Sequence, residues 1–362
     1  MVWPTSERWN RALGKPHDVA TVVTFAPPGG SAVELSLKAG SVSGDSQSNY
    51  RRTGSLSLFG NRADFEMLTL PGGVVHIDHG INFGSTTELV PVFHGEIVDG
   101  SQQLGDGSIS VRVADLGKWL ERARFLTPFT PTAGTQRKSV IATAVIDARP
   151  GTTVTVTATD AGVVQSGTWQ DSRLDMIKDL RTDGAMEAFF LPDGTYLIRD
   201  QLTMSSPPVW SITPGQTGVL KSVSRRRPMD KTYNTVVVRP SSSDGSQTWV
   251  QQVAQVTAVN HPRHPSKIGV VPYFWSSPTT TTAGAALTAA YNILDRVLGT
   301  TETLELGLLS NAALEPGDPI RVVTPQVGLE PADIYQHYVD SFSLDLRSGD
   351  MSIATRSQVT DA

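Results

Sequence analysis

The sequence has no cysteine among its 362 residues. The chain therefore forms no disulfide, thiolate zinc site or iron–sulfur cluster, and it offers no cysteine nucleophile. Charged residues are also few, at 18% of the chain, and 30 Lys+Arg against 35 Asp+Glu give a formal net charge of −5. This mildly acidic balance argues against a protein whose task is to coat nucleic acid.

Long apolar runs are missing as well. No stretch approaches the roughly 20 apolar residues that a membrane helix needs. The first residues lead directly to Glu7, Arg8 and Arg11, without the apolar segment of a targeting signal. We therefore expect a protein that is made in a cytoplasm and does not insert into a membrane.

Glycine and proline are plentiful, at 32 and 23 residues, and hydrophobic residues make up 39%. This composition favours a β-rich protein with many turns. A chain of this length buries about 75% of the surface that its unfolded form exposes, so we expect it to fold without a disulfide or a structural metal. Two or three domains are expected.

Residues 17–115 show the period-two alternation of half-buried antiparallel strands, clearest over 33–39, 55–58 and 108–113. Clusters of Gly, Pro and Asp separate these runs. The pattern predicts a first β-barrel-like domain over 17–115. Residues 1–16 carry Trp3 and Trp9 among polar residues, which indicates an N-terminal arm that is either disordered or docked.

The period changes over 116–215, where we expect a small α+β segment. Leu116, Trp119, Leu120 and Ala123 have helical spacing, and a second helix pattern ends at Pro150. Residues 172–183 read as a helix that begins at a Ser172 cap and ends at Gly184, and a hairpin follows that turns at 192–194.

Strand patterns return over 216–362, which predicts a second β-barrel-like domain containing one helix at about 284–298. Thr281 or Thr282 is the expected N-cap of this helix, and Gly299 its stop. The fold class expected is therefore mainly β with α+β parts, namely two β-barrel-like domains joined by a small α+β segment. No internal repeat is evident, although the order β, α+β, β is roughly symmetrical.

The densest histidine cluster is His76-Ile77-Asp78-His79. In a strand, His76 and Asp78 share one face and His79 lies on the other, so one metal ion could not easily bind all three. A solvated hairpin is the simpler interpretation. His261 and His264 lie between prolines in what reads as a loop, and we assign no metal site.

Catalytic motifs are equally scarce. Gly44-Asp45-Ser46 is reminiscent of a serine-protease nucleophile but lies in a turn cluster, and no Gly-x-Ser-x-Gly elbow, phosphate loop or dinucleotide fingerprint occurs. We assign no catalytic or cofactor-binding residue and expect no cofactor. The basic run 225–227, near Lys221 and Lys231, reads as a solvated linker or a partner of Asp230, with phosphate contact as the alternative.

The order of motifs in the rest of the chain is informative. A helix pattern over 285–298 is followed by a strand at 303–306, by NAALEPGDPIRV at 311–322, and by a closing hairpin from HYVDSFSLDL to MSIATR. Earlier, VFHGEIVDG at 92–100 precedes a strand and ADLGKWLERARF at 114–125. This layout resembles the tail-hub, or baseplate-hub, proteins of long-tailed bacteriophages and related injection machines, also called minor tail proteins.

The resemblance implies a structural virion protein of the tail tip, with no enzyme activity. It implies a homotrimeric ring of six barrel-like units, which joins the tail tube to the host-recognition apparatus and surrounds the channel for genome ejection. The implied partners are other copies of the chain, the tail tube or distal tail ring protein, the tape-measure protein, and a spike or fibre protein. Double-stranded DNA would be present only in passage, and assembly would take place in the host cytoplasm.

Two other classes stay open from the residues alone. A carbohydrate-binding β protein could use exposed aromatics, the candidates being Trp3, Trp9, Trp210, Trp249 and the cluster 273–275. An aromatic set of this kind also suits a core or a subunit interface. A cell-wall hydrolase carried in the tail would need an added domain, and the hub-like parts already account for the length.

Overall fold

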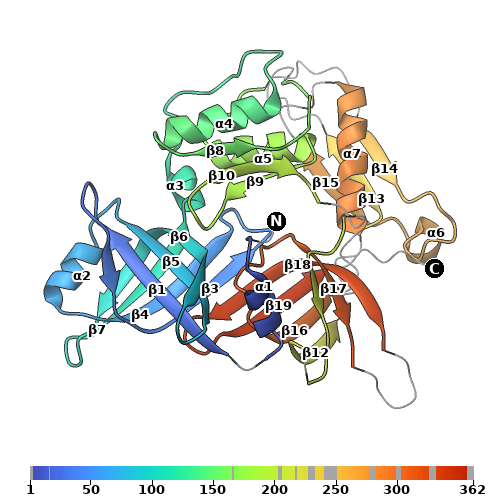
Figure 1. Ribbon diagram of the computed structural model, residues 1–362. Coiled ribbons are helices and arrows are strands. Elements are labelled where there is room, and N and C mark those ends of the chain that lie inside the picture. The colour runs from blue at the N-terminus through green and yellow to red at the C-terminus, as the bar shows by residue number, and fades with distance from the viewer. Residues whose placement is uncertain are drawn as a thin grey trace.

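Most of the chain folds into one large sheet, with two smaller α/β units on one side of it (Figure 1). The computed structural model describes residues 3–15, 17–164, 167–202, 206–216, 218–226, 233–239, 251–276, 280, 282–298, 303–325 and 332–356. Within these residues, a 13-stranded sheet and two 3-stranded sheets form. The fold is mainly β with smaller α+β parts, which confirms the expected class.

The first half of the large sheet is built from residues 18–115, where polar and apolar side chains alternate. Apolar positions such as Leu56 and Val111 are buried, and their neighbours Ser55 and Ser110 face outward. Helix α2 (Arg62–Leu68) packs near β6, and Asn61 caps it with a full capping box. The strands are β1 (Asp18–Ala26), β2 (Val33–Leu35), β3 (Leu37–Asp45), β4 (Arg52–Phe59), β5 (Val74–Asn82), β6 (Thr87–Gln102) and β7 (Ser108–Asp115).

The second half comes from two stretches of the chain, 210–226 and 303–356. Its strands are β11 (Trp210–Ile212), β12 (Leu220–Arg226), β16 (Thr303–Leu309), β17 (Pro319–Val323), β18 (Ile334–Asp345) and β19 (Asp350–Arg356). Strand β18 joins the halves because it pairs antiparallel with β3, from Ser341 opposite Asp45 to Asp345 opposite Ser41. One hydrophobic core runs through both halves.

The large sheet is an open path of strands rather than a closed ladder. Among the described residues the path runs β12-β16-β19-β18-β3-β4-β7-β6-β5-β1-β2, so β12 and β2 are its two ends. The first half nevertheless curls round its core, because residues 33–45 pair with β1 at one end and with β4 at the other.

The first α/β unit spans residues 116–202 and has its own core. Ser172 accepts a hydrogen bond from the Asp175 N–H and caps α5 as expected. Gly184 ends α5 at φ −94°, and the left-handed residue is Ala185, at φ 48°. The elements are α3 (Gly117–Arg122), α4 (Arg137–Ala148), β8 (Val154–Val156), α5 (Arg173–Asp183), β9 (Met186–Phe190) and β10 (Tyr196–Asp200).

The second α/β unit lies within residues 233–298, where the strands form a sheet separate from the large one. Residues 216–362 therefore supply two sheets. The elements are β13 (Thr235–Arg239), β14 (Gln252–Gln255), α6 (Pro265–Ile268), β15 (Pro272–Ser276) and α7 (Ala283–Leu298). The long helix expected near 284–298 is α7, and Thr282 Oγ1 accepts from the Ala285 N–H at its start. Thr281 and Gly299 lie outside the described residues.

The N-terminal arm is docked on the large sheet. Helix α1 (Glu7–Ala12) buries Trp9 to 1% exposure. The Trp9 ring packs on Gly80 of β5, where a Cβ would lie 2.9 Å from the ring and 2.0 Å from the Glu88 carbonyl oxygen. The Trp3 N–H donates to the Ala313 carbonyl in the second half. The arm therefore contacts both halves of the large sheet.

The two halves repeat one arrangement of four strands, β3-β4-β7-β6 in the first and β12-β16-β19-β18 in the second. The first pair in each half has a bulge after its opening residue, Leu37 or Leu220. The long strands β6 and β18 each change partners along their length, and each has a bulge against its neighbour, after Ile97 or Val339. The matching bulges place both halves in one common register.

Single residues follow the same duplication. Asn61 and Asn311 are a matched pair, and each accepts from the backbone N–H two residues on, at 2.7 Å and 3.3 Å. Gly72 and Gly317 are another, and both have positive φ, 90° and 86°. The duplication is therefore one of strand order and register, which the sequence does not display as a repeat. The repeat is hard to see in sequence because a few isolated matches are separated by unrelated inserts. The matched pairs are Leu37 with Leu220, Lys38 with Lys221, Asn61 with Asn311, Pro71 with Pro316 and Gly72 with Gly317.

Candidate functional site: an open serine-rich face and a buried ionic junction

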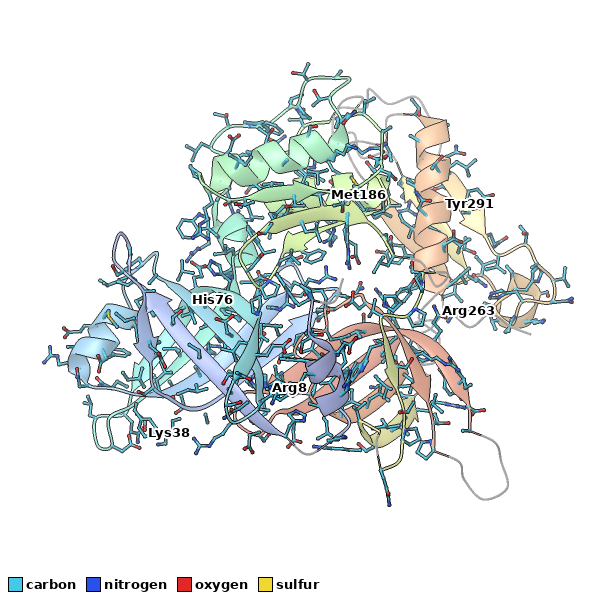
Figure 2. All side chains as sticks on the ribbon, viewed as in Figure 1. Arg8, Lys38, His76, Met186, Arg263 and Tyr291 are labelled. Carbon is cyan, nitrogen blue, oxygen red and sulfur yellow. The ribbon has the colours of Figure 1, made fainter. Side chains whose placement is uncertain are left out.

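The histidine cluster lies in β5 as the strand pattern predicts. His76 Nε2 is 3.1 Å from the Asp78 carboxylate on one face, while His79 is buried on the other and bonds to Thr21 Oγ1. His94, on β6, lies 3.3 Å from His76, ring nitrogen to ring nitrogen. Figure 2 labels His76, near the boundary between the sheet and the first α/β unit. No group of metal-binding side chains suited to an ion occurs in the part of the chain that the structure describes.

The other polar candidates are structural contacts. Ser46 begins the turn after β3, and its hydroxyl donates to Asp340 at 2.8 Å. Arg225 pairs with Asp333 at 3.2 Å, and Lys221 pairs with Asp350. Arg227, Asp230 and Lys231 lie outside the described residues.

The aromatic candidates do not form one surface. Trp9 is in the core, and Trp3 and Trp210 pack against the same core. Tyr273 and Trp275 pack against the core of the second α/β unit, while Phe274 points away and is 52% exposed. Trp249 lies outside the described residues.

The large sheet has one face that its own core does not cover. Along the eight strands from β12 to β6, alternate residues point away from the core, and most of them are serine. They are Ser222 and Ser224 of β12, Glu305 and Gly307 of β16, Ser352 and Ala354 of β19, Ser341 and Ser343 of β18, Ser41, Ser43 and Asp45 of β3, Thr53, Ser55 and Ser57 of β4, Ser110 and Arg112 of β7, and Asp99 and Ser101 of β6. We call this set the serine face.

The serine face is hollowed where the two halves meet. A groove of about 750 Å³ crosses β12, β16, β19, β18, β3 and β4, and its lining includes Ser43, Ser343 and Gly44. Ser43 of β3 and Ser343 of β18 lie opposite each other where these two strands pair, with their hydroxyl oxygens 3.4 Å apart. A side chain at Gly44 would collide with Phe342, so the groove floor needs glycine there.

The charges on the serine face are sparse and partly paired. Arg112 and Asp99 form an ion pair at 2.8 Å. Asp45 and Glu305 add negative charge, and Arg226, two residues after Ser224 on the same face of β12, adds one positive charge. These five residues leave a slight negative excess. The face thus offers hydroxyl groups and few cations, a chemistry with little attraction for phosphates.

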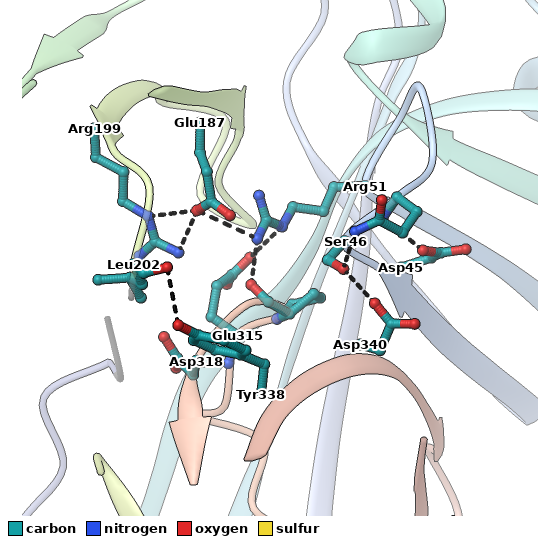
Figure 3. Close-up of polar contacts among 12 residues, drawn as sticks. Asp45, Ser46, Arg51, Glu187, Arg199, Leu202, Glu315, Asp318, Tyr338 and Asp340 are labelled. Atoms are coloured by element: carbon teal, nitrogen blue, oxygen red, sulfur yellow. Dashed lines mark hydrogen bonds and ion pairs between the residues drawn. The ribbon is translucent and has the colours of Figure 1, made fainter. Parts of the chain in front are cut away.

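A buried ionic junction lies where the two halves of the sheet meet the first α/β unit (Figure 3). Its centre is Arg52, at the start of β4, which holds Glu315 through two hydrogen bonds of 2.8 Å and 2.6 Å. Both side chains are at most 2% exposed. A bidentate pair of this kind satisfies both charges at fixed geometry, which is how charged groups tolerate burial.

Arg51 extends the junction into the first α/β unit. Its guanidinium donates to the Pro316 carbonyl and stacks on Phe189, 3.5 Å from the ring centroid. Glu187 of β9 lies 3.9 Å from Arg51 and accepts from Arg199 at 2.8 Å. Burial alone would raise the pKa of Glu187, but the positive charges of Arg51 and Arg199 outweigh it and lower that pKa.

Other groups complete the junction. The Asp115 carboxylate accepts from the backbone N–H groups of Arg52 and Gly117, yet burial raises its pKa to about 6. Burial also raises the pKa of Tyr338 to about 12, and its hydroxyl donates to the Leu202 carbonyl (Figure 3). A polar cavity of about 490 Å³ beside the junction is lined by residues of α5, α7 and β19, including Arg181.

The sequence interpretation missed this junction. Glu315-Pro316-Gly317-Asp318 reads as a surface turn, but Glu315 and Asp318 are both 0% exposed. The signal available was the pair of adjacent arginines, Arg51 and Arg52, in a chain with few charges. Nothing in the sequence showed that they meet a turn some 260 positions away.

The comparisons agree with this architecture. No protein-family model and no curated protein matches the sequence. A tail protein from Neisseria meningitidis MC58 matches the structure with a TM-score of 0.66 and 12% identity, over 93% of this chain and 97% of that one. The 43 kDa tail protein of prophage MuSo2 from Shewanella oneidensis gives 0.63 and 12%, over 93% and 98%.

A third structure, the prophage tail protein gp18 from Listeria monocytogenes EGD-e, gives a TM-score of 0.58 at 10% identity, over 94% of this chain and 95% of that one. The chain therefore has the fold of phage tail proteins along nearly its whole length. This confirms the fold that the motif order implies. No described helix is both long enough and apolar enough to cross a membrane.

Proposed function

We propose that this protein is the structural hub of a phage-type tail tip, a homotrimeric ring around the channel through which the genome is ejected. The observation that carries the proposal is the serine face, a continuous polar surface that spans both halves of a duplicated sheet. Antiparallel sheets often leave one face in water, and in a ring of three copies the serine face of each copy would line the lumen. The likeness to the three tail proteins supports the same role.

The chemistry of the serine face suits passage of double-stranded DNA. Each lysine or arginine that neutralises a phosphate adds salt-dependent affinity, so a cation-rich lumen would hold DNA back. Here Arg112 is neutralised by Asp99, and the remaining charges are mostly negative. Hydroxyl groups keep the surface hydrated without fixed attraction to the duplex.

The role is structural and needs no active site. The tail tube or distal ring protein would meet one rim of the ring, and a spike or fibre protein the other, with the tape-measure protein reaching the lumen. The protein would be assembled in the host cytoplasm and reside at the tail tip of the virion. The two α/β units, which stand on one side of the sheet, would take the contacts outside the lumen (Figure 1).

The test is native mass measurement with negative-stain imaging of the purified chain at high concentration. We expect closed rings of three copies with a central opening. Open filaments, or a chain that stays monomeric at every concentration, would overturn the ring. Glycan binding by the monomer would instead favour a carbohydrate-binding module.

A further inference from the structure

The polar cavity beside the buried ionic junction is walled by all three parts of the molecule. Its volume is about 490 Å³, and its lining includes Tyr338 of β18 in the large sheet, Arg181 of α5 and Asn292 of α7. Figure 3 shows Tyr338 and Glu187, which both line the cavity, next to the junction. Ligand pockets in proteins have volumes of about 300–1,000 Å³, so this cavity has room for an organic molecule or a short peptide segment.

The charged groups of the cavity leave a positive excess. Arg51, Arg181 and Arg356 line it, against the carboxylates of Glu187 and Asp295. Three positive charges against two negative ones contrast with the whole chain, whose formal net charge is −5. An excess of one positive charge matches a single carboxylate better than a phosphate group, which carries about −1.5 to −2 charges near pH 7.

Arg181 is the cation that a ligand can use. It lies in the last turn of α5 and is half-buried, and its side chain has no hydrogen bond or ion pair among the described residues. Arg51, by contrast, donates to the Pro316 carbonyl and lies 3.9 Å from Glu187. Because the Arg181 guanidinium has lost part of its water without gaining an acceptor, an anion in the cavity would supply a charge-assisted hydrogen bond.

Arg356 is the second donor, at the end of β19. Its side chain is 17% exposed, its Nε lies 3.5 Å from Asp340 Oδ1, and its guanidinium lies over the Tyr338 ring. In the amide orientation that satisfies both groups, Gln47 also accepts from it. A guanidinium has five N–H donors, so these contacts leave donors for a ligand.

The turn after α5 brings an unusual backbone conformation to the same wall. Ala185 lines the cavity and has φ 48°, and no other described residue except glycine has positive φ. Alanine adopts this conformation at a cost that glycine avoids. Backbone strain of this kind is often retained at ligand sites, where it fixes the shape of a wall.

We propose that this cavity binds a carboxylate group, carried by a small organic acid or by an acidic peptide segment of a partner protein, and that Arg181 and Arg356 donate to it. The inference goes beyond the proposed function and does not depend on the ring. Because the large sheet, α5 and α7 all contribute to the walls, a bound ligand contacts all three parts of the molecule and stabilises the folded chain.

Isothermal titration of the full chain at constant ionic strength tests the site. The probes are citrate and a capped pentapeptide that contains two glutamates. We expect saturable binding of at least one probe, which Arg181→Gln weakens by about tenfold or more through loss of the charge-assisted hydrogen bond. Arg356→Gln should weaken the same binding.

Arg124→Gln is the matched control. It removes an arginine of the same α/β unit that is 65% exposed, pairs with Asp171 and does not line the cavity, so binding should stay as in the wild type. The urea midpoint of Arg181→Gln should be unchanged, because its side chain has no partner to lose.

The two probes separate the sources of the carboxylate. Tighter binding of citrate supports a small organic acid, and tighter binding of the peptide supports a partner segment. The proposal is overturned if neither probe binds, if Arg181→Gln binds as tightly as the wild type, or if inorganic phosphate binds more tightly than both probes.

Discussion

Single residues of the buried ionic junction constrain parts of the fold beyond the atoms they contact. The Arg52–Glu315 pair is fully removed from water and satisfies both charges with two hydrogen bonds. Removing one partner from such a pair leaves an uncompensated buried charge, which costs about 3–5 kcal/mol. The turn that presents Glu315 must therefore hold its shape closely.

Gly317 is the residue that sets this shape. It has φ 86°, and a Cβ there would lie 2.8 Å from Arg51 Nη2 and 3.3 Å from Glu187 Oε1. We predict that Gly317→Val lowers the free energy of unfolding by about 3 kcal/mol, through backbone strain and loss of the junction. Chemical denaturation measures the effect.

The duplication supplies the control for that variant. Gly72 is the counterpart of Gly317, with φ 90°, but a Cβ there meets only Pro28, at 3.6 Å. Gly72→Val should therefore cost only the strain of the backbone, about 1–2 kcal/mol. Equal losses in the two variants would show that the ionic junction is not what makes Gly317 necessary.

His94 makes stability depend on pH. Burial, with help from His76 and Arg149 and against Asp193, lowers its pKa from 6.5 to about 4. A lowered pKa stabilises the fold above pH 6.5, and this contribution is lost as the pH falls toward 4. We predict that His94→Gln reduces the loss of stability between pH 7.5 and pH 5 by about 2 kcal/mol.

The measurement is the difference between wild type and variant in denaturation midpoints at the two pH values. Two buried carboxyls change stability in the opposite direction over this pH range, because burial raises the pKa of Asp115 to about 6 and that of Asp179 to about 7. Both are present in wild type and variant, so the difference between the two proteins reports His94. The same difference separates His94 from His79, because burial lowers the pKa of His79 as well and that effect is present in both proteins. An unchanged pH dependence in the variant would contradict the prediction.

At the scale of elements, helix α7 separates its packed and open sides clearly. Leu294 is 4% exposed in the core of the second α/β unit, whereas Tyr291 is 52% exposed on the same helix (Figure 2). We predict that Leu294→Asp destabilises this unit by about 3–5 kcal/mol, because it buries an unpaired charge. Hydrogen exchange over 233–298 measures it locally.

Tyr291→Asp adds the same charge on the open side and should change stability by less than about 0.5 kcal/mol. The large sheet has a separate core, so its exchange should stay as in the wild type with either variant. Spread of the Leu294→Asp effect into β3 or β18 would mean that the unit and the sheet unfold together.

Local elements could be predicted from sequence where local chemistry specifies them. Ser172 and the turn 192–194 define α5 and its hairpin, and the apolar spacing of 287–298 defines α7. The separate sheet β14-β13-β15 could not be predicted, because Val236 or Val253 would look the same in either sheet. The meeting of Arg52 with Glu315 depends on long-range register, which no local pattern encodes.

At the scale of the whole molecule, the scarcity of cations on the serine face is itself testable. We predict that Ser43→Lys with Ser343→Lys raises the affinity of the assembled protein for duplex DNA at least tenfold at low salt. The slope of log K against log salt should steepen by about 0.9 for each added phosphate contact. Fluorescence anisotropy of a labelled duplex measures both.

The control adds the same charge away from the serine face, as Leu126→Lys with Tyr291→Lys, at positions that are 100% and 52% exposed. Its affinity for DNA should stay close to that of the wild type. An equal rise in DNA affinity in both variants would show that added positive charge acts at any surface position. The prediction for the serine face would then be wrong.

The junction between β18 and β3 also has a consequence for how assembly proceeds. It forms inside one chain, at the high effective concentration of a tether, so it is complete when the chain has folded. In the proposed ring, only the contacts between chains then cost translational and rotational freedom on assembly. In the proposed ring of three chains and six sheet halves, half of the contacts exist before any two molecules meet, and the nucleation step is correspondingly easier than in a ring of six separate subunits.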